Sequence, residues 1–133
     1  MPRTKLRAGR RGARRPIRLK RVYEEPEPAD GLRVLIDRLW PRGLSRREAA
    51  ADLWLREAAP SNELRRWFGH DPRRWRQFRN KYRKELSKQP DMLHMLDDLR
   101  RRTPITLLFG ARDEAHNNAV VLREILDKPR LMP

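Results

Sequence analysis

The residues Ile105–Phe109 read ITLLF, a nearly continuous apolar run bounded by Pro104 on one side and Gly110 on the other. A run of this length between proline and glycine is typical of a strand that is covered on both faces of a sheet. We predict that it forms the central strand of the fold, around which the other elements are arranged.

Two earlier segments also predict strands. Residues 17–23 (IRLKRVY) alternate apolar and basic side chains, as a half-buried strand does. Residues 33–39 contain three consecutive apolar residues (VLI), and Pro41 ends the segment because proline has no N–H for a strand ladder. The acidic, proline-bearing stretch between the two segments ends in the turn signal Asp30-Gly31.

Five stretches predict helices. Ser45 and Glu48 form a capping box that starts a helix over 45–58. Ser61 or Asn62 caps a helix that ends at Gly69, and further helices are expected over 72–88, 90–103 and 118–126. The residues expected to share an apolar face are Trp75, Phe78, Tyr82 and Leu86 in the third helix, Met92, Met95, Leu96 and Leu99 in the fourth, and Asn118, Leu122, Ile125 and Leu126 in the last.

Strands separated by helical stretches indicate an α/β fold. We predict a small, partly parallel sheet of about three strands, covered by four to five helices in a single domain. The length of 133 residues suits one domain. Residues 17–128 are expected to form it, residues 1–16 to form a basic, disordered arm, and residues 129–133 to form a C-terminal tail.

The composition excludes several kinds of site. The chain has no cysteine, which rules out disulfides, thiolate zinc sites and a cysteine nucleophile. His70, His94 and His116 are not spaced as metal ligands, so we expect neither a metal nor a cofactor. No apolar run reaches the roughly 18 residues of a membrane span, and we therefore expect a cytoplasmic protein that does not bind membranes.

The candidate site follows the predicted strands. Ligands of open α/β sheets bind beyond the carboxyl ends of the strands, and the polar segments 37–43 (DRLWPRG) and 110–118 occupy such positions. We predict one cleft that binds a small anionic ligand, nucleotide-like or phosphorylated, because arginine forms paired hydrogen bonds with phosphate or carboxylate. The residues assigned to the ligand are Arg38, Trp40, Arg42, Arg112, Asp113 and Asn117.

The sequence leaves open whether the protein is an enzyme. If it turns over a substrate, Asp37 and His116 are the candidate catalytic residues, since a carboxylate or an imidazole can transfer protons. The arginines would then stabilise developing negative charge.

Each candidate also has a structural interpretation. Asp37 can pair with a neighbouring arginine, Trp40 can anchor the core, and Asp113 or Asn117 can cap a helix. We favour the core for Trp40 and the cap for Asp113. Arg42, which stands between a proline and a glycine where the backbone can approach a ligand, is the strongest binding candidate.

The charge suggests an alternative function. The net charge is +15, and residues 1–15 carry seven basic side chains and no acid, which favours phosphate contacts to nucleic acid. Arginine outnumbers lysine 27 to 6, a bias that GC-rich codon usage also produces. The many arginines are therefore weaker evidence for nucleic-acid binding than the net charge suggests. The residues assigned to this alternative are Arg10, Arg11, Arg14 and Arg15 in the arm and Arg73, Arg76 and Arg79 on the helix over 72–88. The same helix face could instead dock on an acidic protein, and nothing in the sequence indicates an oligomeric state.

Several of these motifs occur together in one family. KRVY at 20–23, the segment 33–43 that ends in DRLWPRG, APS at 59–61, ELR at 63–65 and TLL at 106–108 resemble the YeaO-like bacterial proteins, part of domain of unknown function 488 (DUF488). The resemblance covers about residues 17–127 and implies a single compact cytoplasmic α/β domain. More distant relatives carry a Cys and a Cys-His-Arg triplet near the last strand, where this chain has Phe109 and Asn117-Asn118-Ala119, so the resemblance implies no thiol chemistry here.

Overall fold

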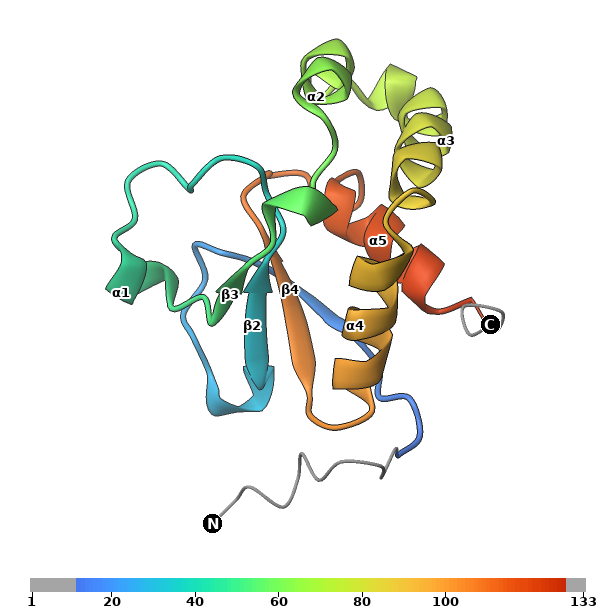
Figure 1. Ribbon diagram of the computed structural model, residues 1–133. Coiled ribbons are helices and arrows are strands. Elements are labelled where there is room, and N and C mark those ends of the chain that lie inside the picture. The colour runs from blue at the N-terminus through green and yellow to red at the C-terminus, as the bar shows by residue number, and fades with distance from the viewer. Residues whose placement is uncertain (1–11, 129–133) are drawn as a thin grey trace.

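The computed structural model describes residues 12–128, which form one four-stranded parallel sheet with helices packed on it (Figure 1). The strand order is β1-β4-β2-β3, and each neighbouring pair is parallel. The strands are β1 (Arg18–Arg21), β2 (Leu32–Leu35), β3 (Leu53–Trp54) and β4 (Ile105–Phe109). The α-helices are α1 (Arg46–Ala49), α2 (Asn62–Phe68), α3 (Trp75–Leu86), α4 (Pro90–Arg100) and α5 (Asn118–Leu126), with 3-10 turns at Pro28–Asp30, Arg56–Ala58 and Pro72–Arg74.

The central strand is confirmed. β4 pairs with β1 on one side and β2 on the other, with Leu107 opposite both Leu19 and Val34. All five residues of β4 are buried. A strand with neighbours on both sides and cover on both faces has no polar environment, which is why an apolar run occupies it.

The predicted helix over 45–58 is wrong beyond its first turn. The capping box is present, with the Ser45 hydroxyl accepting from the Glu48 N–H, but α1 ends after Ala49 because Ala50 takes the left-handed conformation (φ 49°). The chain then returns to the sheet and forms β3, which pairs in parallel with β2. Just after β3, the Leu55 N–H donates to the Leu35 carbonyl at 2.8 Å. Pairing with the edge of β2 therefore overrides local helix propensity and adds the fourth strand.

Two apolar clusters cover the two faces of the sheet. The larger lies under α2, α3, α4 and α5 and includes Ile36, Leu107 and Phe109. The smaller contains Leu35 and Leu108 and is closed by residues of α1 and the segments around it, Trp40 and Trp54 among them. The apolar face of α3 is confirmed, because Phe78, Tyr82 and Leu86 are buried.

The apolar face of α4 departs from the prediction at one position. Met95 is 38% exposed, whereas Leu93, which was not expected in the core, is buried. Met92 and Leu96 are buried as expected. The helix has therefore turned slightly from the orientation that the spacing of its methionines suggests. Among the described residues, none of the helices has the length and apolar character needed to cross a bilayer.

Candidate functional site

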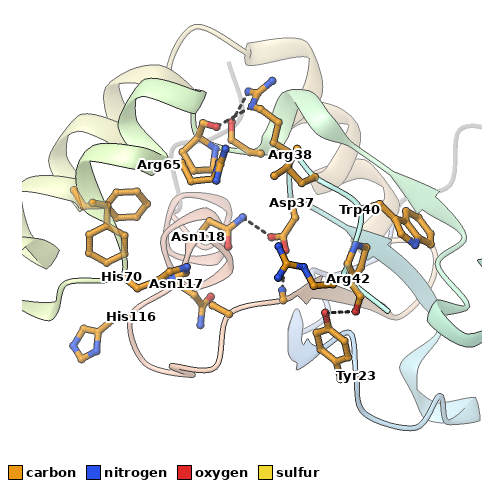
Figure 2. A pocket seen from close by; sticks show the side chains of 18 residues that line it. Tyr23, Asp37, Arg38, Trp40, Arg42, Arg65, His70, His116, Asn117 and Asn118 are labelled. Carbon is orange, nitrogen blue, oxygen red and sulfur yellow. Dashed lines mark hydrogen bonds between the residues drawn. The ribbon is translucent and has the colours of Figure 1, made fainter. Parts of the chain in front are cut away.

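A cleft of about 290 Å³ lies at the carboxyl ends of β2 and β4, where the sequence predicted it. The segments 37–43, 59–70 and 110–118 surround it, and Figure 2 shows their side chains converging on it. Of the predicted residues it is lined by Asp37, Arg38, Trp40, Arg42, His116 and Asn117. Further lining residues include Tyr23, Arg65, Phe68, His70, Phe78, Gly110 and Asn118.

Asp37 stands where β2 ends and is half-buried. Its Oδ2 accepts from the Gly110 N–H at 2.8 Å, and its Oδ1 accepts from the Asn118 side-chain amide at 3.2 Å (Figure 2). A Cβ at Gly110 would lie 3.0 Å from Oδ2, so a larger residue there would press on the carboxylate. Among the described residues no cation forms an ion pair with Asp37, so the predicted pairing with Arg38 or Arg42 is not present.

The environment of Asp37 makes its carboxyl a weaker acid than usual. Burial raises the pKa of its carboxyl above the ordinary value. The hydrogen bonds from Asn118 and Gly110 and the charges of His70 and Arg65 lower the pKa, but they do not offset the burial.

Arg38 and Arg42 have different roles. The Arg38 guanidinium donates to the carbonyls of Pro60 (3.1 Å) and Ala59 (3.3 Å), so it holds one wall of the cleft against β2. The Arg42 side chain is exposed and forms no hydrogen bond or ion pair with the described residues. Its backbone carbonyl accepts from the Tyr23 hydroxyl at 2.9 Å, which ties the DRLWPRG segment to the residues after β1.

Arg65 lines the cleft from α2 and was not found from the sequence. One terminal nitrogen donates to Asn62 Oδ1 at 3.2 Å, and Nε is buried without a hydrogen-bond partner among the described residues. No acid pairs with it there. Arg65 lies in a run of basic residues on a short helix, so no local signal distinguished it from the solvated arginines beside it.

Trp40 has the structural role that the sequence favoured and also lines the cleft. Its indole N–H donates to the Leu44 carbonyl at 2.7 Å, and its ring meets Trp54 edge-on at 5.2 Å between centroids. Trp54 in turn donates to the Asp37 carbonyl at 2.7 Å. The two tryptophans therefore hold the start of the DRLWPRG segment in place.

The segment after β4 supplies fewer of the residues that line the cleft than the sequence predicted. Arg112 is exposed and Asp113 is bound to its own loop, so neither lines the cleft. Asp113 Oδ2 lies 2.9 Å from His116 Nδ1, and this bond holds the pKa of the Asp113 carboxyl below its ordinary value. The favoured role of Asp113 as a helix cap is wrong. Asn117 caps α5, with its Oδ1 accepting from the Val120 N–H at 3.2 Å, whereas Asp113 accepts from the N–H groups of Ala115 and His116 in the loop before the helix.

The two candidate catalytic residues do not face one another. The His116 ring packs edge-on against Trp75, 5.1 Å between centroids, and in Figure 2 it points away from Asp37. His70, which follows the left-handed Gly69 and itself has a φ of 58°, is a lining histidine that sequence reasoning placed only in a turn. No group of three potential metal ligands occurs in residues 12–128.

Most of the arginines assigned to nucleic acid that the structure describes already have a partner within the protein. Arg73 pairs with Asp71 at 3.2 Å and Arg79 with Glu124 at 3.1 Å, whereas Arg76 is exposed. Arg14 pairs with the buried Asp97 at 3.0 Å, and Arg15 donates to the Arg100 carbonyl. Arg10 and Arg11 lie outside the described residues.

Comparison with known proteins gives a family. The chain is 40% identical over 110 residues to "Uncharacterized protein YeaO" of Escherichia coli, which is 83% of this chain and 96% of that protein. It is 37% identical over 111 residues to "Uncharacterized protein Rv3073c" of Mycobacterium tuberculosis, which is 84% of this chain and 93% of that protein. No solved structure matches the chain. Residues 16–131 match DUF488-N3i, which is described as the inactive DUF488-N3 subclade, and the chain therefore belongs to this family.

Proposed function

We propose that the cleft binds a small anionic ligand, nucleotide-like or phosphorylated, in the cytoplasm. The observation that carries the proposal is that Arg42 and Arg65 both line the cleft without an acidic partner among the described residues. An arginine that lacks an acid is available for a carboxylate or phosphate, to which it can donate two parallel hydrogen bonds.

The buried Nε of Arg65 adds a second argument. Buried donors in folded proteins nearly always have an acceptor, and one that has none within the chain often meets a ligand, an ion or water. The described chain therefore leaves part of the hydrogen-bonding capacity of the Arg65 guanidinium unused, and we propose that an anion in the cleft binds this guanidinium. The same anion would sit beside Arg42, whose neighbour Gly43 has a φ of 82° that few other residues adopt.

We propose binding rather than turnover. The two predicted proton-transfer groups are separated in their orientation, and His116 Nδ1 is engaged by Asp113. The description of the family as an inactive subclade supports the same reading. Asp37 is then a recognition group, and Arg38 and Trp40 shape the walls around it.

A thermal-shift screen against phosphorylated metabolites and nucleotides tests the proposal. We expect at least one anion to raise the melting temperature, and Arg42→Ala and Arg65→Ala to abolish the rise. Arg47→Ala is the matched control, because Arg47 is an exposed arginine that does not line the cleft. An anion-dependent shift that survives both cleft substitutions would place the binding site elsewhere.

Nucleic-acid binding is the second proposal, and it is supported by charge. Arg74 and Lys81 lie over the Trp67 ring, with 5.1 and 5.4 Å to its centroid, and Arg76 is exposed on the neighbouring helix. This surface presents cations beside an aromatic ring, a combination that suits a nucleic-acid backbone and its bases.

A further inference from the structure

We propose that the cleft selects anions that also carry a hydrogen-bond donor, an ammonium or amino group, and that Asp37 is the acceptor of that donor. The inference rests on the proposed function and narrows it, because it names the second chemical feature of the ligand. It is carried by the contrast between Asp37 and the two fully buried acids of the described residues. The half-buried Glu85 also has no ion pair there, but it accepts from Ser61 and does not line the cleft, whereas Asp37 does.

The two fully buried acids are paired with cations. Asp30 is fully buried and meets the Lys20 ammonium at 3.1 Å and the Arg33 guanidinium at 2.6 Å. Asp97, also fully buried, meets Arg14 at 3.0 Å and a second arginine, Arg101, at 3.2 Å. A carboxylate removed from water without a cation is unfavourable, and both sites avoid this cost.

Asp37 departs from that pattern. It is half-buried, lines the cleft and has no ion pair among the described residues, although the chain carries 33 basic side chains. Its two protein partners, the Gly110 N–H and the Asn118 amide, each donate to a different oxygen. Because each carboxylate oxygen accepts two hydrogen bonds, both oxygens retain an acceptor position for a ligand.

The charges around Asp37 define the rest of the ligand. Arg42 and Arg65 line the same cleft, and neither is within ion-pair distance of Asp37. A ligand with only negative groups would gain from the arginines but would be repelled by the Asp37 carboxylate in the same cleft. A ligand that places an amino group on Asp37 and a phosphate or carboxylate on the arginines satisfies all three groups.

Phosphorylated amines and nucleotides whose base carries an amino group both have this chemistry. Matched pairs of probes distinguish the two classes. O-phosphoethanolamine and ethyl phosphate differ in an ammonium group, and guanosine and inosine monophosphate differ in one exocyclic amino group. We expect the amino-bearing member of at least one pair to bind the full chain about tenfold more tightly, as a hydrogen bond to a charged group supplies. The net charge of +15 opposes any preference for the ammonium, so such a preference must come from a local acid.

Isothermal titration calorimetry with variants identifies that acid. We expect Asp37→Asn to reduce the ratio of the two affinities within the preferred pair to about one, since the charge of the acceptor is removed. Asp91→Asn is the control, because Asp91 is exposed on α4 and does not line the cleft, and the ratio should be unchanged. If Asp37→Asn does not fold, Asp37→Ser takes its place, with the same expected ratio of about one.

The outcomes separate this inference from the proposed function. If anions bind and Arg42→Ala weakens them, but neither pair shows a preference for its amino-bearing member, Asp37 is not a ligand group and only the inference fails. A preference that persists in Asp37→Asn also overturns it. If no anionic probe binds through Arg42 and Arg65, the proposed function itself fails.

Discussion

Asp30 and Asp37 show how the same side chain acquires opposite properties from its surroundings. Burial alone would raise the pKa of the Asp30 carboxyl, but the Glu27 N–H, Lys20 and Arg33 stabilise its charge and hold the pKa below the ordinary value. Asp37 has amide donors and no ion pair within the described chain. Its burial therefore raises the pKa of its carboxyl above the ordinary value. The first carboxylate therefore stabilises the fold in its charged form, whereas burial destabilises the charged form of the second.

Asp30→Asn should destabilise the protein strongly. Removing one member of a buried ion pair costs about 3–5 kcal/mol, because the partner charges remain buried, here Lys20 and Arg33. Urea unfolding at pH 7 measures the loss, with Asp91→Asn as an exposed control that should change stability by less than about 0.5 kcal/mol.

The pH dependence of the Asp30 effect has a defined sign. A carboxyl whose folded-state pKa is lowered stabilises the fold above its unfolded-state pKa, and this contribution is lost as the pH falls through the folded-state pKa. The gap in unfolding free energy between wild type and Asp30→Asn should therefore narrow on acidification. A gap that widens would mean that the Asp30 carboxylate is not stabilised in the fold.

Asp37→Asn should behave in the opposite way. Since the folded-state pKa of Asp37 is raised, the wild-type protein loses stability as the pH rises from the ordinary carboxyl pKa through the folded-state pKa. The variant has no such loss, so its stability relative to wild type should improve between acid and neutral pH. Urea unfolding of both proteins across this range measures the trend, and the reverse trend would contradict the raised pKa.

At the scale of elements, α2 shows how a short helix is fixed well enough to place a side chain in the wall of the cleft. Ser61 caps it through the Leu64 N–H at 3.1 Å, and Gly69 ends it in the left-handed conformation. Glu85 on α3 accepts from both the N–H and the hydroxyl of Ser61, at 2.8 and 2.7 Å. The cap is thus also the joint between α2 and α3, and it orients Arg65 and Phe68 toward the cleft.

Ser61→Ala should therefore cost more than the matching change in α1. Loss of a helix cap costs about 1 kcal/mol, and here Glu85 also loses the Ser61 hydroxyl, so we expect about 2 kcal/mol in total. Ser45→Ala removes an exposed cap and should cost no more than about 1 kcal/mol. Chemical unfolding of the two variants compares them, and equal losses would show that the bond from the Ser61 hydroxyl to Glu85 contributes nothing.

At the scale of the whole molecule, the basic charge is only partly available to a partner. Several arginines are already engaged, including Arg14 with Asp97, Arg73 with Asp71 and Arg79 with Glu124. The first eleven residues contain five basic side chains and no acid, namely Arg3, Lys5, Arg7, Arg10 and Arg11. We therefore expect that segment to contribute a large share of any nucleic-acid affinity.

The salt dependence of DNA and RNA binding tests how much of the nucleic-acid affinity comes from the first eleven residues. A shortened chain should begin at Gly12 rather than at Ile17, so that Arg14 still pairs with Asp97. For duplex DNA, removing five cations should reduce the slope of log affinity against log salt by at most about 4.5, since each phosphate contact contributes about 0.9. Fluorescence anisotropy measures both chains. An unchanged slope would assign binding to the helix surface around Trp67, and absence of binding at low salt would overturn the nucleic-acid proposal.

The sequence alone determined the features that depend on neighbours along the chain. The apolar run ITLLF predicted β4, Ser61 and Gly69 bounded α2, and the spacing of Phe78, Tyr82 and Leu86 predicted the buried face of α3. These signals are local, because caps act within one helical turn and apolar periodicity reflects a single element. The position of the cleft also followed, since parallel strands expose their carboxyl ends on one edge.

Only the tertiary structure decided the pairings between distant segments. β3 forms because the edge of β2 lies beside Leu53 and Trp54, and Arg65 reaches the cleft because Ser61 and Glu85 fix α2 against α3. Asp37 is held by Gly110 and Asn118, 73 and 81 residues away in sequence, rather than by the arginines next to it. Which charge is paired and which is left without an ion pair depends on such long-range contacts, because the energy of a buried charge is set by all the groups around it.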